Sequence, residues 1–471
     1  MAQAQAEIGL IGLGTMGAAL ALNIAEKGFP VAVFNRTVEK THSFHKGAGV
    51  LSGNVVPCET LEALVAAIRA PRAIILMVTA GAGVDSQIAA LRPLLGPGDI
   101  IIDAGNANFR DTNRRMAEAD AQGWRFLGIG VSGGEEGARH GPSVMAGGPQ
   151  GAWDRVAPVF RAIAAQYKGE ACAARMGETG AGHFVKTVHN GIEYADMQMI
   201  AEVYGVMRDG LGMEARAIGD VFARWNEGVL NSYLIEISAA VARATDAATG
   251  KPMLDIILDR AGQKGTGRWT VIEAQHLGAP VSAIEAAVAA RNLSAALEAR
   301  KAGEAIFGAR NPIRPDVTIE ALEQALIAGK ILCYAQGFAL ITAAAADQGW
   351  ALPLPEIARI WRAGCIIRST MLGDMARALE VAPERNLMHS EPFTAMLVKG
   401  EAALRQVVAA GALAALPVPA LAAGLSYFDT MRMARTTADM IQGQRDFFGA
   451  HGFERTDRPG AHHGPWAMTP G

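Results

Sequence analysis

The first 180 residues alternate short apolar runs with segments of helical periodicity. Five runs are almost continuously hydrophobic and are rich in Val and Ile: "EIGLIGLG", "VAVFN", "AIILMV", "DIIIDAGN" and "FLGIGVSGG". Strands covered on both faces have this composition, which is typical of a parallel sheet. Each run leads into a glycine, a turn or a helical segment, so the pattern predicts a doubly wound α/β domain over residues 1–180.

From residue 181 onward the strand pattern disappears, and Ala, Leu, Ile and Met recur at helical spacing with breaks at Gly and Pro. This pattern predicts a large all-α domain over 181–440, with an internal boundary at "GARNPIRPD" (308–316). Periodicity is absent after about residue 452. The sequence therefore predicts a Rossmann-type α/β domain, a helical substrate and dimerisation domain, and an extended C-terminal tail over 441–471.

Residues 407–428, "VVAAGALAALPVPALAAGLSYF", carry no charge over a length that can cross a bilayer. Alanine dominates the stretch, and "PVP" interrupts it at its centre. Two short helices in an Ala-rich bundle account for this pattern better than a membrane span does. We therefore expect no membrane association.

Composition narrows the class of protein. The 471 residues are 50% hydrophobic with a net charge of −3, and Lys and Arg are scattered, which does not indicate a nucleic-acid partner. Cys58, Cys172, Cys333 and Cys365 are far apart, so the sequence favours neither a disulfide framework nor a metal site. No signal peptide precedes the first predicted strand. These features predict a cytoplasmic protein.

A glycine-rich turn follows the first predicted strand. "GLGTMG" has GxGxxG spacing and opens a helical segment. In this setting Gly12 permits the tight turn, Gly14 lets the backbone approach a pyrophosphate, and Gly17 lets helix and strand pack closely. The helix N-terminus offers free N–H groups to the phosphates. The predicted dinucleotide contacts here are Gly12, Leu13, Gly14, Thr15, Met16 and Gly17.

The end of the second predicted strand indicates which dinucleotide binds. It reads "VFNRT", with Asn35, Arg36 and Thr37 and no acidic residue. An NAD site usually carries Asp or Glu here, which accepts a hydrogen bond from the ribose 2′-hydroxyl. The guanidinium of Arg36 can instead bind a 2′-phosphate, whereas Glu39 lies too far past the strand end. The predicted cofactor is NADP.

The segment "KTVHNGIEYADMQ" (186–198) places polar side chains at steps of three and four. Lys186, His189, Asn190, Glu193 and Tyr194 would share one side of an α-helix, within an arc of about 140°. An apolar stripe lies nearly opposite. The solvated face of an amphipathic helix has the same pattern, so periodicity alone does not identify a site.

A dinucleotide site gives this segment a chemical interpretation. An enzyme that oxidises an alcohol by hydride transfer needs a base for the hydroxyl proton. His189 has an ordinary pKa near neutrality. The pKa of Lys186 would have to fall from about 10.4 toward 7, and burial beside cofactor and substrate can lower it that far. The residues alone leave the choice between Lys186 and His189 open.

Five long motifs carry a family resemblance: "GHFVKTVHNGIEYADMQ", "GVSGGEEGARHGPSVM", "AGQKGTGRW", "GCIIRS" and "QRDFFGAH". They resemble the decarboxylating, NADP-linked 6-phosphogluconate dehydrogenases of the pentose phosphate pathway, and the resemblance runs nearly end to end. It implies oxidation of 6-phosphogluconate to ribulose 5-phosphate and CO2. It also implies that Lys186 is the general base and Glu193 the general acid, with no metal.

The resemblance implies the remaining contacts as well. Asn106 in "DAGNAN" would touch both cofactor and substrate. Further cofactor contacts after the third predicted strand are Val78, Thr79 and Ala80. The implied substrate contacts are Asn106, Ser132, Gly133, Gly134, His189, Asn190, Tyr194, Lys264, Thr266, Arg291, Arg445 and His451. In the family the last two come from the partner subunit, so the resemblance also implies a homodimer whose tails complete each other's sites.

Three positions depart from the family pattern. Gly14 stands where alanine is common, Thr79 where many members carry a lysine, and Ala146 where a proline is common. The first fingerprint is thereby closer to that of the related β-hydroxyacid dehydrogenases. None of the three positions belongs to the implied proton-transfer pair.

Two alternatives stand beside this interpretation. One is an NADP-linked β-hydroxyacid dehydrogenase that acts without decarboxylation on a smaller, unphosphorylated acid. It would leave Lys264, Arg291 and Arg445 without a phosphate to hold. The other is a non-catalytic NADP-binding sensor, in which Lys186 and Glu193 would have no chemical task.

Overall fold

The computed structural model describes residues 5–263, 265–309 and 313–466. Lys264, an implied phosphate contact, lies outside the described residues. The chain divides into two compact units, Met1–Gly424 and Leu425–Gly471. The predicted division at residues 180 and 440 remains a prediction about folding units.

Eight strands of the described chain form one sheet in the order β10-β7-β6-β5-β4-β1-β2-β3. They are β1 (Ile8–Ile11), β2 (Val31–Phe34), β3 (Val55–Pro57), β4 (Ala73–Leu76), β5 (Ile100–Asp103), β6 (Arg125–Ser132), β7 (Ser143–Gly147) and β10 (Ala173–Gly177). Every neighbouring pair is parallel except β6 and β7, which are antiparallel. The order from β3 to β6 is that of a Rossmann-type fold, which confirms the predicted fold class.

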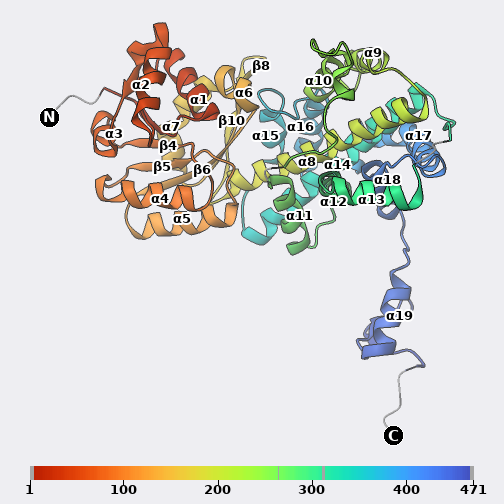
Figure 1. Cartoon of the computed structure of the whole chain (residues 1–471). Coiled ribbons are helices and arrows are strands. Elements are labelled where there is room, and N and C mark those ends of the chain that lie inside the picture. The colour runs from red at the N-terminus through yellow and green to blue at the C-terminus, as the bar shows by residue number, and fades with distance from the viewer. Residues whose placement is uncertain (1–4, 264, 310–312, 467–471) are drawn as a thin grey trace. The chain divides into compact units, whose positions relative to one another are not determined.

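Helices cover both faces of this sheet. They are α1 (Thr15–Glu26), α2 (Val38–Gly47), α3 (Leu61–Ala67), α4 (Ala82–Leu91), α5 (Phe109–Ala121), α6 (Gly134–His140) and α7 (Gln150–Ile163). Side chains of α1 and α7 form the core on one face, and those of α3, α4 and α5 form the core on the other. The ribbons of α4 and α5 run along one side of the sheet (Figure 1). β1, β4 and β5 are buried along their whole length, which explains their continuous apolar sequences.

The five predicted runs correspond to β1, β2, β4, β5 and β6, but three strands of the sheet were not predicted. β3, "VVP", has only three residues. β7 ("SVMAG") and β10 ("AARMG") are short and rich in Ala and Gly, so they lack the β-branched pattern. They become strands because β6 offers a free edge on which β7 pairs antiparallel.

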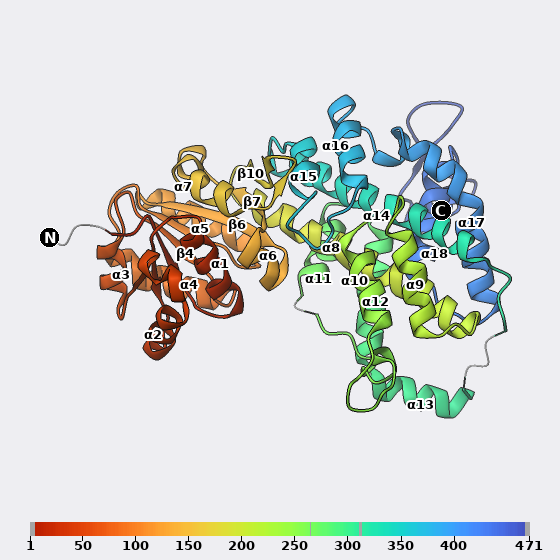
Figure 2. The same cartoon turned by 90° about the horizontal axis from the view of Figure 1, so that it is seen from above.

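The helical part begins with α8, a 25-residue helix that starts four residues after the end of β10. Its members are α8 (Ala181–Gly205), α9 (Ala215–Trp225), α10 (Tyr233–Arg243), α11 (Thr266–His276), α12 (Ser282–Ala295), α13 (Leu297–Phe307), α14 (Ile319–Gln348), α15 (Leu354–Ile360), α16 (Met371–Val381), α17 (Phe393–Leu413) and α18 (Pro419–Met431). α14 packs against both α8 and α17 (Figures 1 and 2).

Two apolar segments bear on the membrane question. In the described chain, α14 is long and apolar enough to cross a bilayer, but 89% of its most apolar window is buried inside the structure. The uncharged stretch 407–428 falls on the end of α17 and the start of α18, with "PVP" between them. α14 is therefore a core helix, whereas 407–428 alternates buried residues such as Val407 and Leu421 with exposed ones such as Leu413.

The predicted boundary at 308–316 falls between α13, which ends at Phe307, and α14, which begins at Ile319. Residues 310–312 of that segment lie outside the described residues. The segments on either side are helical, as predicted.

The second unit contains α19 (Ala438–Gly449) and the two-residue strands β11 (Phe453–Glu454) and β12 (Ala461–His462), which pair antiparallel. The sequence predicts an extended tail here, and the described residues are more ordered than that. This order leaves no periodic apolar pattern in the sequence, because it depends on hydrogen bonds to a single polar residue.

That residue is Asp446, whose carboxylate is buried. It accepts hydrogen bonds from Gly452 N–H at 3.0 Å, Gly464 N–H at 2.9 Å and Trp466 Nε1–H at 2.9 Å, and it pairs with His463 at 2.6 Å. The Gly464 N–H contributes most to lowering the pKa of Asp446, which falls to about 2. The carboxylate therefore holds α19 and the following loop together as one unit.

Candidate active site

The glycine-rich turn between β1 and α1 has the geometry of a phosphate-binding loop. Gly12 has a positive φ of 103°, and a Cβ there would collide with the carbonyl oxygen of Met77. A Cβ at Gly17 would collide with the carbonyl oxygen of Gly12, whereas a Cβ at Gly14 would meet no atom of the described residues within 4 Å. Gly14 therefore borders open space at the N-terminus of α1, where free N–H groups favour a phosphate.

The residues that follow β2 differ in their surroundings. The Asn35 side-chain oxygen accepts a hydrogen bond from Leu13 N–H at 3.1 Å, and Asn35 N–H donates to Thr41 Oγ1 at 3.1 Å. Arg36 and Thr37 are exposed. Asn35 therefore fastens the glycine-rich turn to the end of β2 and leaves Arg36 as the exposed cation beside it.

The loops after β4 and β5 lie beside the same turn. β1 and β4 are neighbours where the strand order reverses, and ligands of doubly wound sheets bind at such a point. A Cβ on Gly12 would be 3.2 Å from Val78 Cγ1, and one on Gly105 would be 3.5 Å from the Val78 carbonyl oxygen. The predicted cofactor contacts at this edge are half-buried or exposed: Thr15, Met16, Val78, Thr79, Ala80 and Asn106.

The polar stripe of α8 is buried, so interpreting it as a solvated helix face is wrong. Lys186 is 6% exposed and His189 is completely buried. Asn190 and Tyr194 are buried as well, while the Glu193 side chain keeps 19% of its surface exposed. A helix that is polar on one side yet buried on all sides needs partners for its polar groups.

Space for the start of α8 comes from two glycines of β6 that the sequence reading missed. A Cβ on Gly130 would collide with Lys186 Cβ and would lie 2.8 Å from its Cγ. A Cβ on Gly128 would lie 2.7 Å from His183 Nδ1. Residues two apart on a strand share a face, so Gly128 and Gly130 leave one face of β6 without side chains, and α8 packs directly on it. We call this pair of glycines the bare track. The G-x-G spacing within a strand was the available signal.

The polar groups around Lys186 form a connected set. Lys186 Nζ donates a short hydrogen bond to Asn190 Oδ1 and lies 3.4 Å from His189 Nδ1. The other nitrogen of His189 lies 3.3 Å from Ser132 Oγ. Asn190 Nδ2 donates to Thr266 Oγ1 at 2.7 Å. The structure thus brings together these five predicted residues from β6, α8 and α11.

Burial shifts the pKa values of the ionisable groups in this set. It lowers the pKa of Lys186, against the opposing charge of Glu193. It lowers the pKa of His189 well below its ordinary value, and the Lys186 charge lowers it further. It raises the pKa of Glu193, against the charges of Lys186 and Arg291. The lysine is therefore easier to deprotonate and the glutamic acid easier to keep protonated than in water.

Glu193 and Tyr194 continue the site along α8. A carboxylate oxygen of Glu193 lies 3.8 Å from His189 Nδ1. The guanidinium of Arg291 stacks 3.6 Å above the Tyr194 ring, and Arg291 Nη1 donates to the Gly262 carbonyl at 3.3 Å. The predicted substrate residue Arg291 thus lies beside α8 as a partly solvated cation.

The "VSGG" loop after β6 is shaped by close backbone packing. Gly133 has a φ of 108°, and a Cβ there would lie 2.6 Å from the Gly364 carbonyl oxygen. Gly134 has a φ of 64°, and a Cβ added there would meet no atom of the described residues within 4 Å. Gly133 therefore joins this loop to the "GCIIRS" segment, while Gly134 borders open space.

Arg445 and His451 lie in the second unit. Both are exposed there, with Arg445 Nη1 donating to Gln442 Oε1 at 2.8 Å and the His451 ring against that of Phe448 at 5.9 Å. Among the described residues no group of three or more His, Cys, Asp or Glu side chains could hold a metal ion.

Comparison with known proteins identifies the family. Residues 7–177 match the "NAD binding domain of 6-phosphogluconate dehydrogenase", and residues 182–466 match "6-phosphogluconate dehydrogenase, C-terminal domain". The chain belongs to the 6-phosphogluconate dehydrogenase family. It is an oxidoreductase of the decarboxylating type, and relatives of that type match over almost the full length. This decides against the shorter β-hydroxyacid dehydrogenases and against a non-catalytic sensor.

Individual members of the 6-phosphogluconate dehydrogenase family differ in cofactor. Two Bacillus subtilis (strain 168) enzymes each match 98% of this chain and 99% of their own length, the NADP(+)-dependent one at 46% identity and the NAD(+)-dependent one at 44%. The structure of Plasmodium falciparum 6-phosphogluconate dehydrogenase, solved with NADP+ and with 6-phosphogluconate, is 40% identical. It covers 98% of this chain and 100% of its own, with a TM-score of 0.94. Overall similarity therefore establishes NAD(P) binding.

Proposed function

We propose that Lys186 and Glu193 carry out the proton transfers in the oxidative decarboxylation of 6-phospho-D-gluconate to D-ribulose 5-phosphate and CO2. The observation behind this assignment is the buried contact set of α8. Among the described residues, the hydrogen-bond partners of Lys186 are the neutral groups of Asn190 and His189. Burial lowers the pKa of a lysine so placed, so it loses its proton more readily than a lysine in water, as a general base requires. The residues alone left the choice between Lys186 and His189 open. The contacts of His189 favour Lys186, because both nitrogens of the buried His189 ring already face neighbouring side chains.

The residues act in sequence. Lys186 takes the proton of the C3 hydroxyl, and the bound dinucleotide supplies a nicotinamide ring that accepts the hydride from C3. Protonated Lys186 then gives its proton to the C3 ketone oxygen, where charge develops as the C1 carboxylate leaves as CO2, so that an enediol of C2 and C3 remains. Glu193 protonates the former C2, which becomes C1 of ribulose 5-phosphate, while Lys186 takes back the C3 hydroxyl proton. The raised pKa of Glu193 suits it to act as this acid.

The structure supplies groups to hold the substrate around this pair. His189 and Asn190 contact the Lys186 amine, Ser132 contacts the far nitrogen of the His189 ring, and Thr266 contacts Asn190. The open space at Gly134 suits backbone N–H donation to the sugar acid. We assign the phosphate to Thr266, Arg291 and, from the sequence resemblance, Lys264.

We infer NADP as the preferred dinucleotide. Arg36 is exposed beside the glycine-rich turn, and Asn35 is already engaged with Leu13 and Thr41. The strand end therefore presents a cation and no carboxylate, which suits a 2′-phosphate and not a free ribose 2′-hydroxyl.

We further propose a homodimer in which Arg445 and His451 serve the partner's substrate site. Both side chains are exposed on the second unit, next to exposed apolar residues of α19 such as Phe447 and Phe448. Mixed dimers test this directly. Lys186→Met and Arg445→Ala chains, each inactive alone, should regain part of the activity when co-expressed, because one of the two sites then has both functional residues.

We place the enzyme in the cytoplasm. Its four cysteines are free and buried, as suits a reducing compartment.

One assay tests the proposed reaction. The purified chain is incubated with 6-phosphogluconate and NADP or NAD, and reduced cofactor, CO2 and ribulose 5-phosphate are measured. Equal molar amounts of the three products are expected, with NADP preferred. 3-Hydroxyisobutyrate is the unphosphorylated control and should give no turnover. Reduced cofactor without CO2 would contradict the proposal.

A further inference from the structure

The loop that carries Asn106 leads directly into α5, and the first turn of α5 makes contacts with two other elements. The loop is held at its start by Asp103, whose Oδ1 accepts from Gly105 N–H at 3.1 Å. It is held at its end by Asn108, whose Oδ1 accepts from Arg110 N–H at 2.9 Å. The position of the Asn106 loop therefore follows the position of this turn.

One contact joins the turn to the helix of Lys186. Thr112 Oγ1 lies 2.7 Å from His183 Nδ1, and the same hydroxyl donates to the Asn108 carbonyl at 3.2 Å. Both side chains are buried against the bare surface of Gly128. His183 precedes Lys186 by three residues, so the two share a face of α8 one turn apart. Burial lowers the pKa of His183, which keeps the ring neutral and the contact unchanged near neutral pH.

A second contact joins the turn to α11. The Arg110 guanidinium binds both carboxylate oxygens of Glu273, with Nε–Oε1 at 2.9 Å and Nη2–Oε2 at 2.6 Å. The Arg110 side chain is half exposed, but Glu273 is buried. The two parallel hydrogen bonds of this pair fix both the distance and the relative orientation of the first turn of α5 and α11. Glu273 lies two turns along α11 from Thr266.

α8 and α11 are in turn fastened to each other. Thr270 Oγ1 donates to the Thr187 carbonyl at 2.7 Å, and Asn190 bonds Thr266. A Cβ on Gly191 would lie 2.7 Å from Thr270 Oγ1, so the two helices are in close contact. The first turn of α5, α8 and α11 thus form a closed triangle of contacts.

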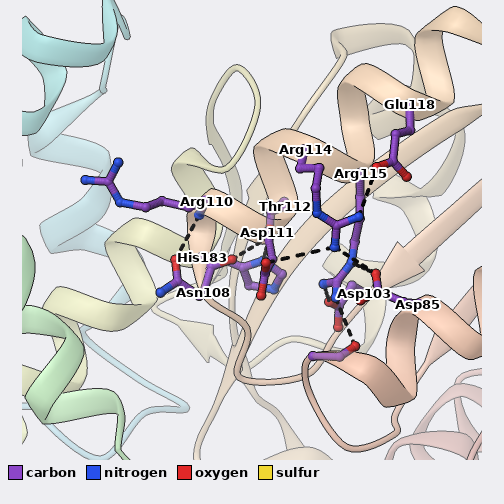
Figure 3. A network of polar contacts seen from close by, with 11 residues as sticks. Asp85, Asp103, Asn108, Arg110, Asp111, Thr112, Arg114, Arg115, Glu118 and His183 are labelled. Atoms are coloured by element: carbon purple, nitrogen blue, oxygen red, sulfur yellow. Dashed lines mark hydrogen bonds and ion pairs between the residues drawn. The ribbon is translucent and has the colours of Figure 1, made fainter.

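The rest of α5 has a different task. Arg115 is buried and binds Asp85 at 2.8 Å, Asp103 at 3.3 Å and the Gly81 carbonyl at 3.0 Å, which fastens the helix to the sheet domain. Figure 3 shows Arg110 pointing away from this cluster, while Thr112 lies against His183. Arg114 binds Asp85 and Glu118 on the exposed side of the same helix, within the dinucleotide domain.

We propose that Arg110 and His183 are positioning residues for the reaction. Through Arg110–Glu273 and Thr112–His183, the first turn of α5 sets the Asn106 loop at a fixed distance from the helices that carry Lys186 and Thr266. The turn thereby couples the binding of dinucleotide to the binding of the sugar phosphate. This inference rests on the proposed roles of Asn106, Lys186 and Thr266.

The test compares Arg110→Ala with Arg114→Ala, which removes a matched arginine from the same helix. Dinucleotide dissociation constants are measured with and without 6-phosphogluconate, along with kcat, KM and the thermal midpoint. In Arg110→Ala, the dinucleotide affinity without substrate should stay within about twofold of the wild type. The increase in that affinity caused by 6-phosphogluconate should be several-fold smaller, and kcat/KM should fall about tenfold. Arg114→Ala should match the wild type in all ligand measurements.

Three further variants keep the result decisive. Glu273→Gln should reproduce the loss of coupling between dinucleotide and substrate binding. The Arg110→Ala/Glu273→Gln double variant should lose no more of this coupling than either single variant does. Thr112→Val should lower kcat without changing dinucleotide affinity. Identical coupling in the Arg110 and Arg114 variants, or a lowered midpoint with unchanged coupling, would overturn the inference. Lys186→Met is assayed in parallel, since its full activity would refute the proposed site itself whatever the Arg110 result.

Discussion

Two buried lysines on two long helices have opposite surroundings. Lys330, near the middle of α14, donates to both carboxylate oxygens of Asp196 at 2.8 and 2.7 Å, and both side chains are essentially inaccessible to solvent. Lys186, near the start of α8, has an amide and an imidazole as its nearest partners, and the Glu193 carboxylate acts only as an opposing charge.

The difference lies in whether a carboxylate is in contact with the amine. A buried ion pair compensates the charge of each member and holds two helices in register, as Lys330 and Asp196 do for α14 and α8. A buried amine with neutral partners is easier to deprotonate, because burial disfavours its charged form. The same residue type therefore serves structure in α14 and is available for chemistry in α8.

The largest expected effect tests the chemical lysine. Lys186→Met should lower kcat by about 10³-fold or more, because a positioned base is worth roughly that much. The thermal midpoint and dinucleotide binding should stay close to wild type, since no ion pair is broken. Initial rates at saturating 6-phosphogluconate, with cofactor binding followed by fluorescence, measure both. Substantial residual turnover would assign the base to another group.

The structural lysine should respond in the opposite way. Lys330→Met leaves the Asp196 carboxylate buried without its partner, which should lower the free energy of unfolding by about 3–5 kcal/mol. Urea titration measures the loss, and kcat per folded molecule should change little. The double variant Lys330→Met/Asp196→Leu should recover much of the stability. A Lys330→Met variant that is fully stable but inactive would contradict the structural role assigned to Lys330.

Glu202 extends the comparison to a buried acid on α8. It accepts hydrogen bonds from Ala420 N–H at 2.8 Å and Leu421 N–H at 3.0 Å, yet burial outweighs them and raises its pKa from 4.5 to about 7. Because the folded state binds this proton more tightly, the associated stability is complete below pH 4.5 and is lost as pH rises through 7.

A shift of this size corresponds to about 3 kcal/mol. Urea titrations between pH 4.5 and 8 should show that decline in the wild type and a flatter profile in Glu202→Gln. Glu304→Gln, on the exposed helix α13, is the matched control and should keep the wild-type slope. Equal slopes in all three proteins would mean that Glu202 titrates as it does in water.

The smallest effect concerns an exposed cation. Arg36→Ala should weaken NADP binding about tenfold to a hundredfold, or about 1.4–2.8 kcal/mol, and leave NAD binding nearly unchanged. Titration calorimetry with each dinucleotide measures the ratio directly. An unchanged preference for NADP would move the recognition of the 2′-phosphate to another residue.

The sequence predicted most of the dinucleotide domain because its signals are local. A glycine turn follows a buried strand, and the second strand ends in Asn35, Arg36 and Thr37 without an acid. The polar stripe of α8 was visible as a pattern, but its burial was not, because burial depends on β6, α11 and α14 packing around α8. The contacts of His183, Thr112, Arg110 and Glu273 were missed for the same reason, since they join residues 71 and 163 positions apart.

The bare track of Gly128 and Gly130 has a consequence for how such an enzyme can vary. With no side chain interposed between the strand and α8, main-chain atoms of β6 set the depth at which Lys186 lies. Homologous chains can therefore diverge widely in their apolar interiors while the reacting groups keep their alignment. A methyl group added at residue 130 would collide with Lys186 Cβ and would displace that residue.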